Sequence, residues 1–499
     1  NLCEMGKRQR KTGVVDMNFE EYPFKTTPYE HQIKSLQRSV HRQEYAYFLE
    51  MGLGKSKVLL DNAAILFDEG KIDALVVITP KGNLRNWDKL EIPRHLPDHI
   101  ERRVLVWQPN HTKQWREKYD EMVKDDSHGV LNILTVNVEA FSTKKGCLFV
   151  ENFLNVHHAM MAVDESTLIK NPKAQRTKNL LKLSTLPRYK RILTGFPVTK
   201  APLDLFSQCA FLSPNLLGFS SYYAFRARYA VIKQRQLGRG RSFQEIVDFQ
   251  RLDELQGALS DFSVRYTKDE CLDLPEKVYM RREVELTDEQ KQAYHTMKKE
   301  ALMIVENSLF STQSVLTQLM RLQQVVAGSL RDADGNTVVL KNNRVKEVLS
   351  LLEETRGKVI LFAVFQTDIE ALQKAIAEKF GEDSVATYYG PTSASDREKT
   401  LDRFQDEDDS LRFFVSNPHT GGRGLTLTAA NTMIFYSNSY DLELRLQAED
   451  RIHRIGQTNR CTYVDLVAPG TVDEKILDSL RKKVKISNEV LGEVKEWLV

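Results

Sequence analysis

The sequence predicts an α/β protein of two lobes, each built around a parallel β-sheet, with helical insertions between them. Three observations predict this class. Short apolar runs alternate with segments of helical periodicity, which is the pattern of parallel sheets covered by helices. The runs fall into two sets, separated by a long stretch that is poor in apolar strands. Finally, 499 residues are more than a single hydrophobic core usually holds.

The predicted strands are short apolar runs of the kind that parallel sheets bury on both faces. The first set comprises "YAYFLE", "DALVVITP", "NILTVN", "AMMAVDE" and "YKRILTG". The second set comprises "KVILFAVF", "LRFFVSNP", "NTMIFYSN" and "TYVDLVA". Helix-like segments such as "SKVLLDNAAILFDEG" lie between the runs. Two sets of strands imply two α/β lobes.

The region from about Pro202 to Val326 is predicted to be mainly helical, because "EQKQAYHTMKKEALMIVENSL" and "SVLTQLMRLQQVVAG" are amphipathic at helical spacing. "RDADGNTVVL" then predicts a turn or hairpin. "IKQRQLGRGRSF" is interpreted as a basic loop that either faces DNA or is simply solvated. The C-terminal "SLRKKVKISNEVLGEVKEWLV" predicts a helix that braces the lobes. Its apolar face would carry Leu480, Val484, Leu491 and Val494.

Composition narrows the function only slightly. Hydrophobic residues make up 41% and charged residues 28% of the chain, an ordinary globular mixture. The net charge of +3 argues neither for nor against nucleic acid, and we interpret the basic cluster "GKRQRKTG" as a loose tail. The 5 cysteines form no C-x-x-C pair, so no zinc site is indicated. No apolar run reaches the roughly 18 residues of a membrane span, so we expect none.

A glycine-rich loop, "EMGLGKS", joins a predicted strand to a predicted helix. Such a loop exposes backbone N–H groups to an anion at the start of a helix, and glycine allows the phosphates to approach closely. Lys55 would reach the β- and γ-phosphates, and the Ser56 hydroxyl would bind Mg²⁺. Leu49 stands where the strict G-x-x-x-x-G-K-[ST] pattern has its first glycine. Taken alone, the loop could still be an ordinary glycine turn.

A second chemical signal is "HHAMMAVDEST", in which an apolar strand runs straight into Asp164 and Glu165. The carboxyl end of a parallel strand faces the crevice where ligands bind. Asp164 would hold Mg²⁺, and Glu165 would polarise the attacking water as general base. A solvated acidic strand end is the alternative, and the upstream G-K-S disfavours it.

The order of these motifs resembles the Swi/Snf-type ATPases, a branch of the superfamily-two helicase-like proteins that translocate on double-stranded DNA. "EMGLGKS", "TPYEHQIKSL" and "ITPKGNLRNW" resemble three family motifs of the first lobe. "DEST" stands where the family has "DEAH" or "DEGH", so Ser166 and Thr167 depart from the usual form. "LTGFPVTK" resembles the segment that couples the ATP site to DNA, and "SVRYTKDECLDLPEK" resembles the linker between the lobes.

The resemblance continues through "YYGPTSASDREKTLDRFQ", "HTGGRGLTLTAANTMIFYSNSY" and "QAEDRIHRIGQ". It implies two RecA-like lobes with ATP between them and arginine fingers, Arg451 and Arg454, supplied from the second lobe. These arginines lie three apart on a predicted helix and so share one face. His453 between them could be a packing or hydrogen-bonding residue. The implied catalytic residues are Lys55, Asp164, Glu165, Arg451 and Arg454; the nucleotide contacts are Gln32, Gly52, Leu53, Gly54, Lys55, Ser56 and Gln457; the Mg²⁺ ligands are Ser56 and Asp164.

The resemblance also implies contacts with DNA that go mainly to phosphates. Lysine and hydroxyl donors suit phosphate oxygens, and glycine exposes backbone N–H groups. The implied DNA-binding residues are Lys81, Asn137, Arg397, Thr420, Gly421 and Gly422. None of these residue types reads bases in an obvious way, so movement independent of sequence is expected.

We therefore expect six regions: an N-terminal extension (1–25), an ATP-binding lobe (26–200), its helical insertion with the linker (201–275), a helical insertion of the second lobe (276–335), the second lobe (336–470) and the brace helix (471–499).

The expected function is ATP-dependent translocation on double-stranded DNA in repair, recombination, replication or remodelling of DNA–protein complexes, with ATP and Mg²⁺ as cofactors. The alternatives are a branched-DNA remodeller or strand-separating helicase, and a nucleotide-gated DNA-binding scaffold that does not hydrolyse ATP. We expect a monomer of the compact bacterial or viral type, or the excised core of a longer protein. It would be cytoplasmic in a bacterium or virus-infected cell and nuclear in a eukaryote.

Overall fold

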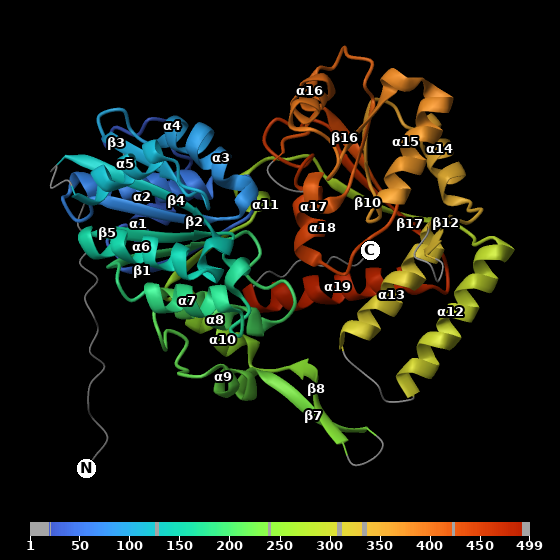
Figure 1. Ribbon diagram of the computed structural model, residues 1–499, viewed down its shortest axis with the longest axis horizontal. Helices are drawn as coiled ribbons and strands as arrows, with labels where there is room; N and C mark the ends of the chain where they lie inside the picture. The colour runs from blue at the N-terminus through green and yellow to red at the C-terminus, as the bar shows by residue number, and fades with distance from the viewer. Residues whose placement is uncertain are drawn as a thin grey trace.

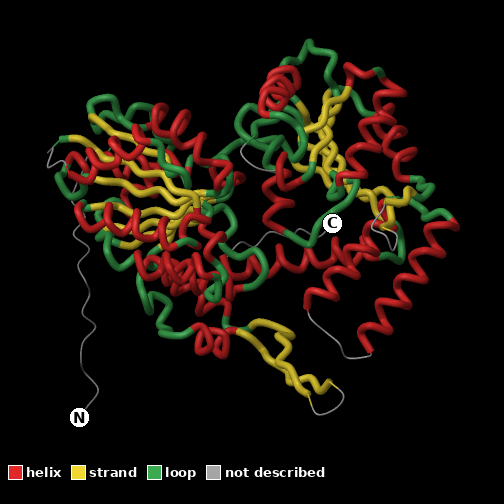
Figure 2. Tube along the Cα trace, in the orientation of Figure 1, coloured by secondary structure: helices red, strands yellow, loops and turns green. Residues whose placement is uncertain are grey.

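The structure is a computed structural model that describes residues 19, 21–124, 129–237, 241–306, 312–331, 337–421 and 425–491. Two lobes are plain in Figure 1, and Figure 2 shows a separate set of strands at the centre of each. The predicted basic tail and most of the N-terminal extension lie outside the described residues. Among the described residues, no helix combines the length and apolar character needed to cross a bilayer.

The first lobe surrounds a seven-stranded sheet in the order β3-β4-β2-β5-β6-β1-β9, in which every pairing is parallel. Its strands are β1 (Glu44–Leu49), β2 (Ala74–Thr79), β3 (Glu101–Val106), β4 (Val130–Asn137), β5 (Ala159–Asp164), β6 (Tyr189–Leu193) and β9 (Ser263–Tyr266). Its helices are α1 (Glu30–Ser39), α2 (Lys55–Asp68), α3 (Leu84–Asn86), α4 (Ile92–His95), α5 (Lys113–Lys124), α6 (Lys144–Val156), α7 (Gln175–Leu183), α8 (Leu205–Leu212) and α10 (Leu252–Ser260).

Helices cover both faces of this sheet, which explains why its central strands are largely apolar. In β1, Ala46 and Phe48 enter one hydrophobic core, whereas Tyr45, Tyr47 and Leu49 enter the core on the opposite face. Successive side chains of a strand point to opposite faces, so both sets must be apolar.

The second lobe surrounds a six-stranded parallel sheet in the order β10-β17-β16-β13-β15-β14. Its strands are β10 (Lys277–Glu283), β13 (Lys358–Phe362), β14 (Val385–Tyr388), β15 (Phe413–Ser416), β16 (Ala430–Phe435) and β17 (Cys461–Val467). Its helices are α14 (Arg344–Glu354), α15 (Gln366–Phe380), α16 (Ala394–Gln405), α17 (Pro418–Gly421) and α18 (Leu442–Glu449). The two faces again form separate cores, which Val359 and Leu361 on one side and Ile360 and Phe362 on the other illustrate.

The segments between the lobes are less purely helical than expected. They include α9 (Tyr222–Tyr229), α11 (Lys268–Cys271), α12 (Asp288–Glu306) and α13 (Thr312–Ala327). Short 3₁₀ turns occur elsewhere in the chain, at Lys81–Asn83, Val138–Ser142, Ser166–Ile169, Pro202–Asp204 and Glu382–Ser384. However, β9 and β10, which lie inside the predicted insertions, are edge strands of the two sheets. The predicted hairpin is confirmed, since β11 (Ser329–Arg331) pairs antiparallel with β12 (Thr337–Val339).

The interpretation of "IKQRQLGRGRSF" as a loop is wrong. Its ends belong to an antiparallel hairpin of β7 (Ala230–Leu237) and β8 (Arg241–Phe249), which projects from the first lobe in Figure 1. This hairpin is exposed and polar, and cross-strand pairs such as Arg235–Glu245, at 2.6 Å, stabilise it. Neither strand is a continuous apolar run, so the apolar pattern that predicts buried strands does not reveal this hairpin.

The last helix, α19 (Val472–Leu491), contacts elements of both lobes: α10 and the Pro202–Asp204 turn in the first, α18 in the second, and α13 beside it. It lies across the bottom of both lobes in Figure 1. Leu480 and Val484 pack in the hydrophobic cluster there, as their spacing indicates. The Leu491 side chain and Val494 lie outside the described residues.

Candidate ATP site and DNA-facing edge

The glycine loop connects β1 to α2, as the sequence predicts. Gly52 and Gly54 both have left-handed backbones, with φ of 86° and 79°. A Cβ atom on Gly54 would lie 2.3 Å from the Gln32 Nε2 atom, so a larger residue would have to displace that amide from the Leu53 carbonyl. Gly54 is the N-cap of α2, and Lys55 and Ser56 are the first two residues of the helix. The start of α2 therefore has the geometry of an anion site.

The Lys55 ammonium lies inside this loop. Its Nζ donates hydrogen bonds to the carbonyl oxygens of Leu49 at 3.0 Å and Glu50 at 3.4 Å. A positive charge held beside the helix start complements a phosphate group.

Gln32 braces the same loop. Its Nε2 donates to the Leu53 carbonyl oxygen at 3.0 Å, and its Oε1 accepts from the Tyr29 backbone N–H at 3.0 Å. The neighbouring His31 ring also bonds the Leu53 carbonyl, at 2.9 Å. The structure thus places Gln32 against the loop, with both of its amide atoms engaged by backbone groups; the contact of Gln32 and Leu53 with nucleotide stays a prediction.

The two carboxylates lie at the end of β5 in different surroundings. Asp164 is buried, and its Oδ2 accepts hydrogen bonds from Thr79 Oγ1 at 3.0 Å and Trp87 Nε1 at 2.9 Å. Glu165 has a left-handed backbone with φ of 54°, which is costly for a residue with a side chain and recurs at functional sites. Its Oε2 accepts from Thr194 Oγ1 at 3.4 Å. Asp164 is held firmly, and Glu165 is turned out of the strand direction.

Two further residues reach this site from a π-turn at Trp87–Glu91. Trp87 holds Asp164, and Glu91 accepts a hydrogen bond from Asn86 Nδ2 at 3.1 Å. Burial raises the pKa of Glu91; the nearby Asp164 carboxylate raises it further, whereas the Asn86 bond and the Ser56 hydroxyl lower it. Sequence reasoning missed Glu91, because the motif that resembles the family ends at Trp87. π-turns are rare and occur often at functional sites.

The residues present fit Mg²⁺. Ser56 and Asp164 offer hydroxyl and carboxylate oxygens, and Mg²⁺ prefers one or two carboxylates together with substrate phosphate oxygens. In the described parts of the chain, no cluster of three His, Cys, Asp or Glu side chains forms a ready-made metal cage. This donor set therefore suits an ion that arrives with the nucleotide.

The second lobe brings Arg451 and Arg454 against the glycine loop of the first. The prediction that they lie on a helix is wrong, because α18 ends at Glu449 and both arginines lie in the turns that follow it. Arg451 Nη2 lies 3.8 Å from the Met51 sulfur, and its Nη1 donates to the Leu425 carbonyl at 2.8 Å. Arg454 bonds the same carbonyl at 3.1 Å, and its Cβ lies 3.9 Å from the position of a Cβ on Gly52. Burial, and then the charge of Arg454, lower the pKa of Arg451 to about 10, while Asp450 and Glu165 oppose the shift. With this pKa, the Arg451 guanidinium is charged at neutral pH beside the loop.

The linker between the lobes contributes a buried ion pair to this seam. Lys268 Nζ contacts Asp450 Oδ1 at 2.7 Å and the His453 carbonyl at 2.5 Å. His453 bonds the Pro275 carbonyl through Nε2 at 2.9 Å, which assigns it a hydrogen-bonding role. Gln457, predicted to contact nucleotide, directs its Nε2 to backbone carbonyls of its own lobe, including that of Ala430 at 2.9 Å.

The described DNA candidates lie at the carboxyl edges of the two sheets. Thr79 pairs with Asn137 in the first sheet, so Lys81 and Asn137 share one edge. In the second sheet, β14 pairs with β15, and Thr420 and Gly421 follow β15. Arg397 folds back onto this edge, where its Nη2 donates to the Tyr389 carbonyl at 2.7 Å. Gly422 lies outside the described residues.

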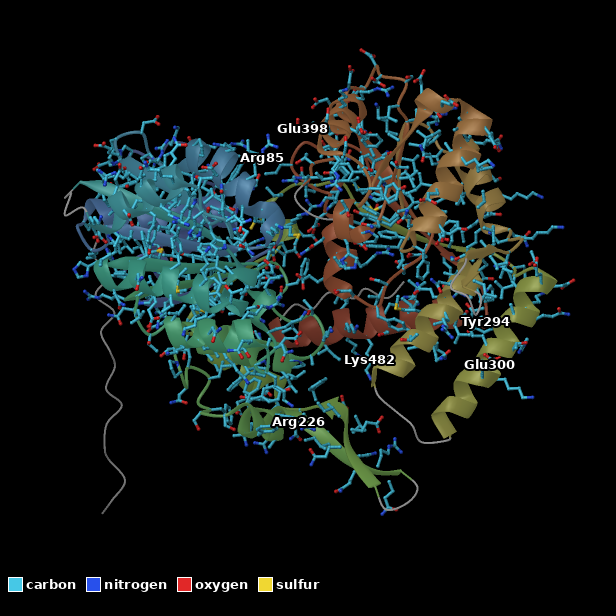
Figure 3. The ribbon with its side chains drawn as sticks, in the orientation of Figure 1. Arg85, Arg226, Tyr294, Glu300, Glu398 and Lys482 are labelled. Atoms are coloured by element: carbon cyan, nitrogen blue, oxygen red, sulfur yellow. The ribbon has the colours of Figure 1, made fainter. Side chains whose placement is uncertain are left out.

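The two edges approach each other near α3 and α16. Arg85 and Glu398, which point toward one another across the gap in Figure 3, form an ion pair of 3.0 Å between the lobes. Their side chains are 79% and 64% exposed, so this pair contributes little energy.

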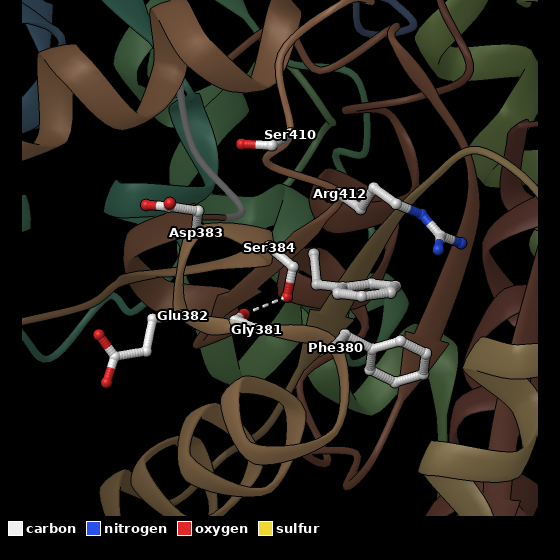
Figure 4. A pocket seen from close by; sticks show the side chains of 8 residues that line it. Phe380, Gly381, Glu382, Asp383, Ser384, Ser410 and Arg412 are labelled. Atoms are coloured by element: carbon white, nitrogen blue, oxygen red, sulfur yellow. Dashed lines mark hydrogen bonds between the residues drawn. The ribbon is translucent and has the colours of Figure 1, made fainter.

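A pocket of about 320 Å³ at the outer end of the second lobe does not belong to this site. Figure 4 shows its lining, with the Ser384 hydroxyl bonded to the Gly381 carbonyl. Ser384 and Arg412 precede β14 and β15, so the pocket lies at the amino ends of the strands. Ligands of open parallel sheets bind at the opposite, carboxyl ends.

Replacing Trp87 with phenylalanine should weaken the Mg²⁺ site. The ring is retained, but Asp164 loses a donor that orients it, and loss of such outer partners costs about 10–100-fold in metal affinity or activity. We expect the Mg²⁺ concentration for half-maximal ATP hydrolysis to rise about tenfold. Trp115→Phe is the matched control, because Trp115 Nε1 donates to the Val106 carbonyl away from the site. An equal effect of both variants would contradict the assignment.

Two parallel-sheet lobes with a glycine loop, a strand-end carboxylate pair and arginines from the opposite lobe define a helicase-like ATPase. A model of the SNF2-related domain matches residues 31–329, and a model of the helicase conserved C-terminal domain matches residues 340–456. The chain therefore belongs to the SNF2-related family.

Two curated relatives agree with this assignment. "DNA annealing helicase and endonuclease ZRANB3" of Bos taurus is 27% identical over 454 residues, covering 90% of this chain and 39% of the relative. "ATP-dependent DNA helicase DDM1" of Arabidopsis thaliana is 25% identical over 465 residues, covering 89% of this chain and 59% of the relative. The solved "Sulfolobus solfataricus SWI2/SNF2 ATPase core in complex with dsDNA" is 23% identical, with a TM-score of 0.42, over 96% of this chain and 99% of that one. The chain thus spans less than two thirds of each of these two curated relatives.

Proposed function

We propose that this protein hydrolyses ATP in the seam between its lobes and uses the resulting movement to translocate along double-stranded DNA. The observation that carries the proposal is the contact of Arg451 and Arg454 with the glycine loop, at Met51 and Gly52. Because the two walls of the ATP site come from different lobes, the phosphate state and the lobe spacing become one coupled variable. The site is complete within one chain, which supports a monomer.

Each residue has a defined role in this proposal. Lys55 binds the phosphates, Ser56 and Asp164 hold Mg²⁺, and Glu165 accepts the proton of the attacking water. Bound Mg²⁺ would neutralise charge on the β- and γ-phosphates. Arg451 and Arg454 stabilise the charge of the transition state. Lys81, Asn137 and the Thr420–Gly421 segment would hold DNA phosphates on either side of the seam.

A branched-DNA remodeller or strand-separating helicase is the second candidate. The observation in its favour is the β7–β8 hairpin, which projects from the first lobe and carries exposed Lys233 and Arg235. The matched bovine relative is itself named a DNA annealing helicase. A scaffold that does not hydrolyse ATP is disfavoured, because all of the predicted catalytic side chains gather around one seam.

The test is the ATPase rate without DNA and with single-stranded, duplex or forked DNA. We expect duplex DNA to raise kcat by about tenfold or more, since DNA held across both lobes favours closure by roughly the usual allosteric coupling. Single strands should stimulate less, and a labelled fork should remain paired. Unwinding or reannealing of the fork would favour the second candidate, and an absence of any DNA effect would refute both.

A further inference from the structure

Glu443, on α18 of the second lobe, binds two side chains of the first lobe. Thr167 Oγ1 donates to Glu443 Oε1 at 3.0 Å, and Lys170 Nζ lies 3.6 Å from Oε2. The Glu443 side chain is only 12% exposed, and Thr167 is buried. This polar contact between the lobes is therefore shielded from water, unlike the Arg85–Glu398 pair.

On the first-lobe side, the contact is continuous with the segments around the catalytic carboxylates. Thr167 follows Glu165 by two residues and Asp164 by three, and Glu165 is the N-cap of the turn that contains Thr167. Lys170 Nζ also donates to Thr199 Oγ1 at 2.6 Å, and the Thr199 hydroxyl in turn donates to Asp204 at 3.1 Å. Thr199 lies in "LTGFPVTK", the segment that follows β6.

On the second-lobe side, the contact leads to the arginine that faces the loop. Gln447 Nε2 donates to Glu443 Oε1 at 3.3 Å, one helical turn away. The Gln447 carbonyl accepts a hydrogen bond from Arg451 Nε at 2.8 Å. Three successive contacts thus join Thr167, beside the general base, to Arg451.

We propose that Glu443 is a positioning residue, which locks α18 and the Arg451 turn that follows it to the carboxylate segment when the lobes close. A buried carboxylate must be paired, so Glu443 favours closure only when Thr167 and Lys170 are both in place. Any shift of the "DEST" turn during hydrolysis is then passed to α18 and Arg451. The departure of Thr167 from the usual family form gains a function, since its hydroxyl binds Glu443, whereas the Ser166 hydroxyl donates to Gln208 in the first lobe. This inference rests on the proposed ATPase function.

Four variants test it. Glu443→Ala removes every contact, whereas Glu443→Gln keeps an acceptor for Thr167 and removes the charge facing Lys170. The exchanged pair Lys170→Glu with Glu443→Lys restores opposite charges in reversed order. Glu398→Gln is the matched control, because it breaks the exposed ion pair between the same lobes.

We expect Glu443→Ala to lower DNA-stimulated kcat about tenfold, as coupled contacts typically do, with the KM for ATP changed less than about threefold. Glu443→Gln should lie between it and the wild type. The exchanged pair should recover most of the loss, and Glu398→Gln should match the wild type. Wild-type kcat in Glu443→Ala, or an exchanged pair no more active than Glu443→Ala, would overturn the proposal.

Hydrogen exchange of the same proteins gives a readout that does not depend on ATP hydrolysis. Exchange in residues 442–449 and 166–170 should become faster in Glu443→Ala and return toward wild type in the exchanged pair, while α16 is unchanged. Uniformly faster exchange would indicate general destabilisation and overturn the specific role. If the wild type lacks DNA-stimulated hydrolysis, the proposed function fails, and the exchange pattern still decides whether Glu443 joins the lobes.

Discussion

Replacing Glu165 with glutamine should lower the rate of ATP hydrolysis by about 10²–10⁴-fold, the usual contribution of a general base. The amide cannot accept the proton of the attacking water, but it keeps the size of the side chain. Asp164, Lys55 and Ser56 are unchanged, so nucleotide and Mg²⁺ should still bind. Single-turnover hydrolysis measures the loss, and binding of a fluorescent ATP analogue checks that the site remains formed.

Glu101→Gln is a suitable control, because Glu101 is exposed at the start of β3, at the edge of the sheet opposite the carboxyl ends. It should hydrolyse ATP at the wild-type rate. If Glu165→Gln also retains wild-type turnover, another group activates the water, and the assignment of the base is wrong.

Replacing Arg451 with alanine should lower kcat by about 10³–10⁵-fold, as removal of an arginine finger does. The guanidinium is the second-lobe group that reaches Met51 and acts electrostatically on Glu165. Arg451→Lys keeps the charge but cannot bond both the Gln447 and the Leu425 carbonyls, so it should recover only part of the rate. ATP binding to the first lobe should change far less than kcat.

Arg460→Ala is the matched control, because Arg460 is an exposed arginine of the same lobe, paired with Glu276 at 3.5 Å. Its kcat should equal that of the wild type. Thermal unfolding separates a catalytic loss from misfolding, since Arg451 is buried and its removal leaves the Leu425 carbonyl with one donor fewer. Unchanged kcat in a folded Arg451→Ala protein would refute hydrolysis across the seam.

The central strands of both sheets could be predicted because each is buried on two faces. Such a strand must be largely apolar, as β2 (ALVVIT) and β13 (KVILF) are. Strands without that constraint escaped prediction. The edge strand β3 begins with charged residues. Strands β9 and β14 are only four residues long. The β7–β8 hairpin is held together by exposed polar pairs.

The residues of the candidate site likewise fall into two groups, those that the sequence could predict and those that it could not. Gly54, Lys55, Asp164 and Glu165 could be predicted, because their chemistry depends on residue type and on a strand–loop–helix order that is local in the sequence. Gln457 and Arg397 lie near their predicted places but bond to backbone of their own lobe. Those side chains depend on tertiary surroundings that a motif does not contain.

The sequence alone determined that the chain has two α/β lobes, one carrying a phosphate loop with acidic partners and the other a pair of arginines. Local chemistry and periodicity suffice for those statements. Only the tertiary structure decided that Trp87 orients Asp164, that Lys268 pairs with Asp450, and that Glu443 joins the lobes. These contacts connect residues 77, 182 and 276 positions apart, and such distant partners are chosen by packing rather than by any pattern along the chain.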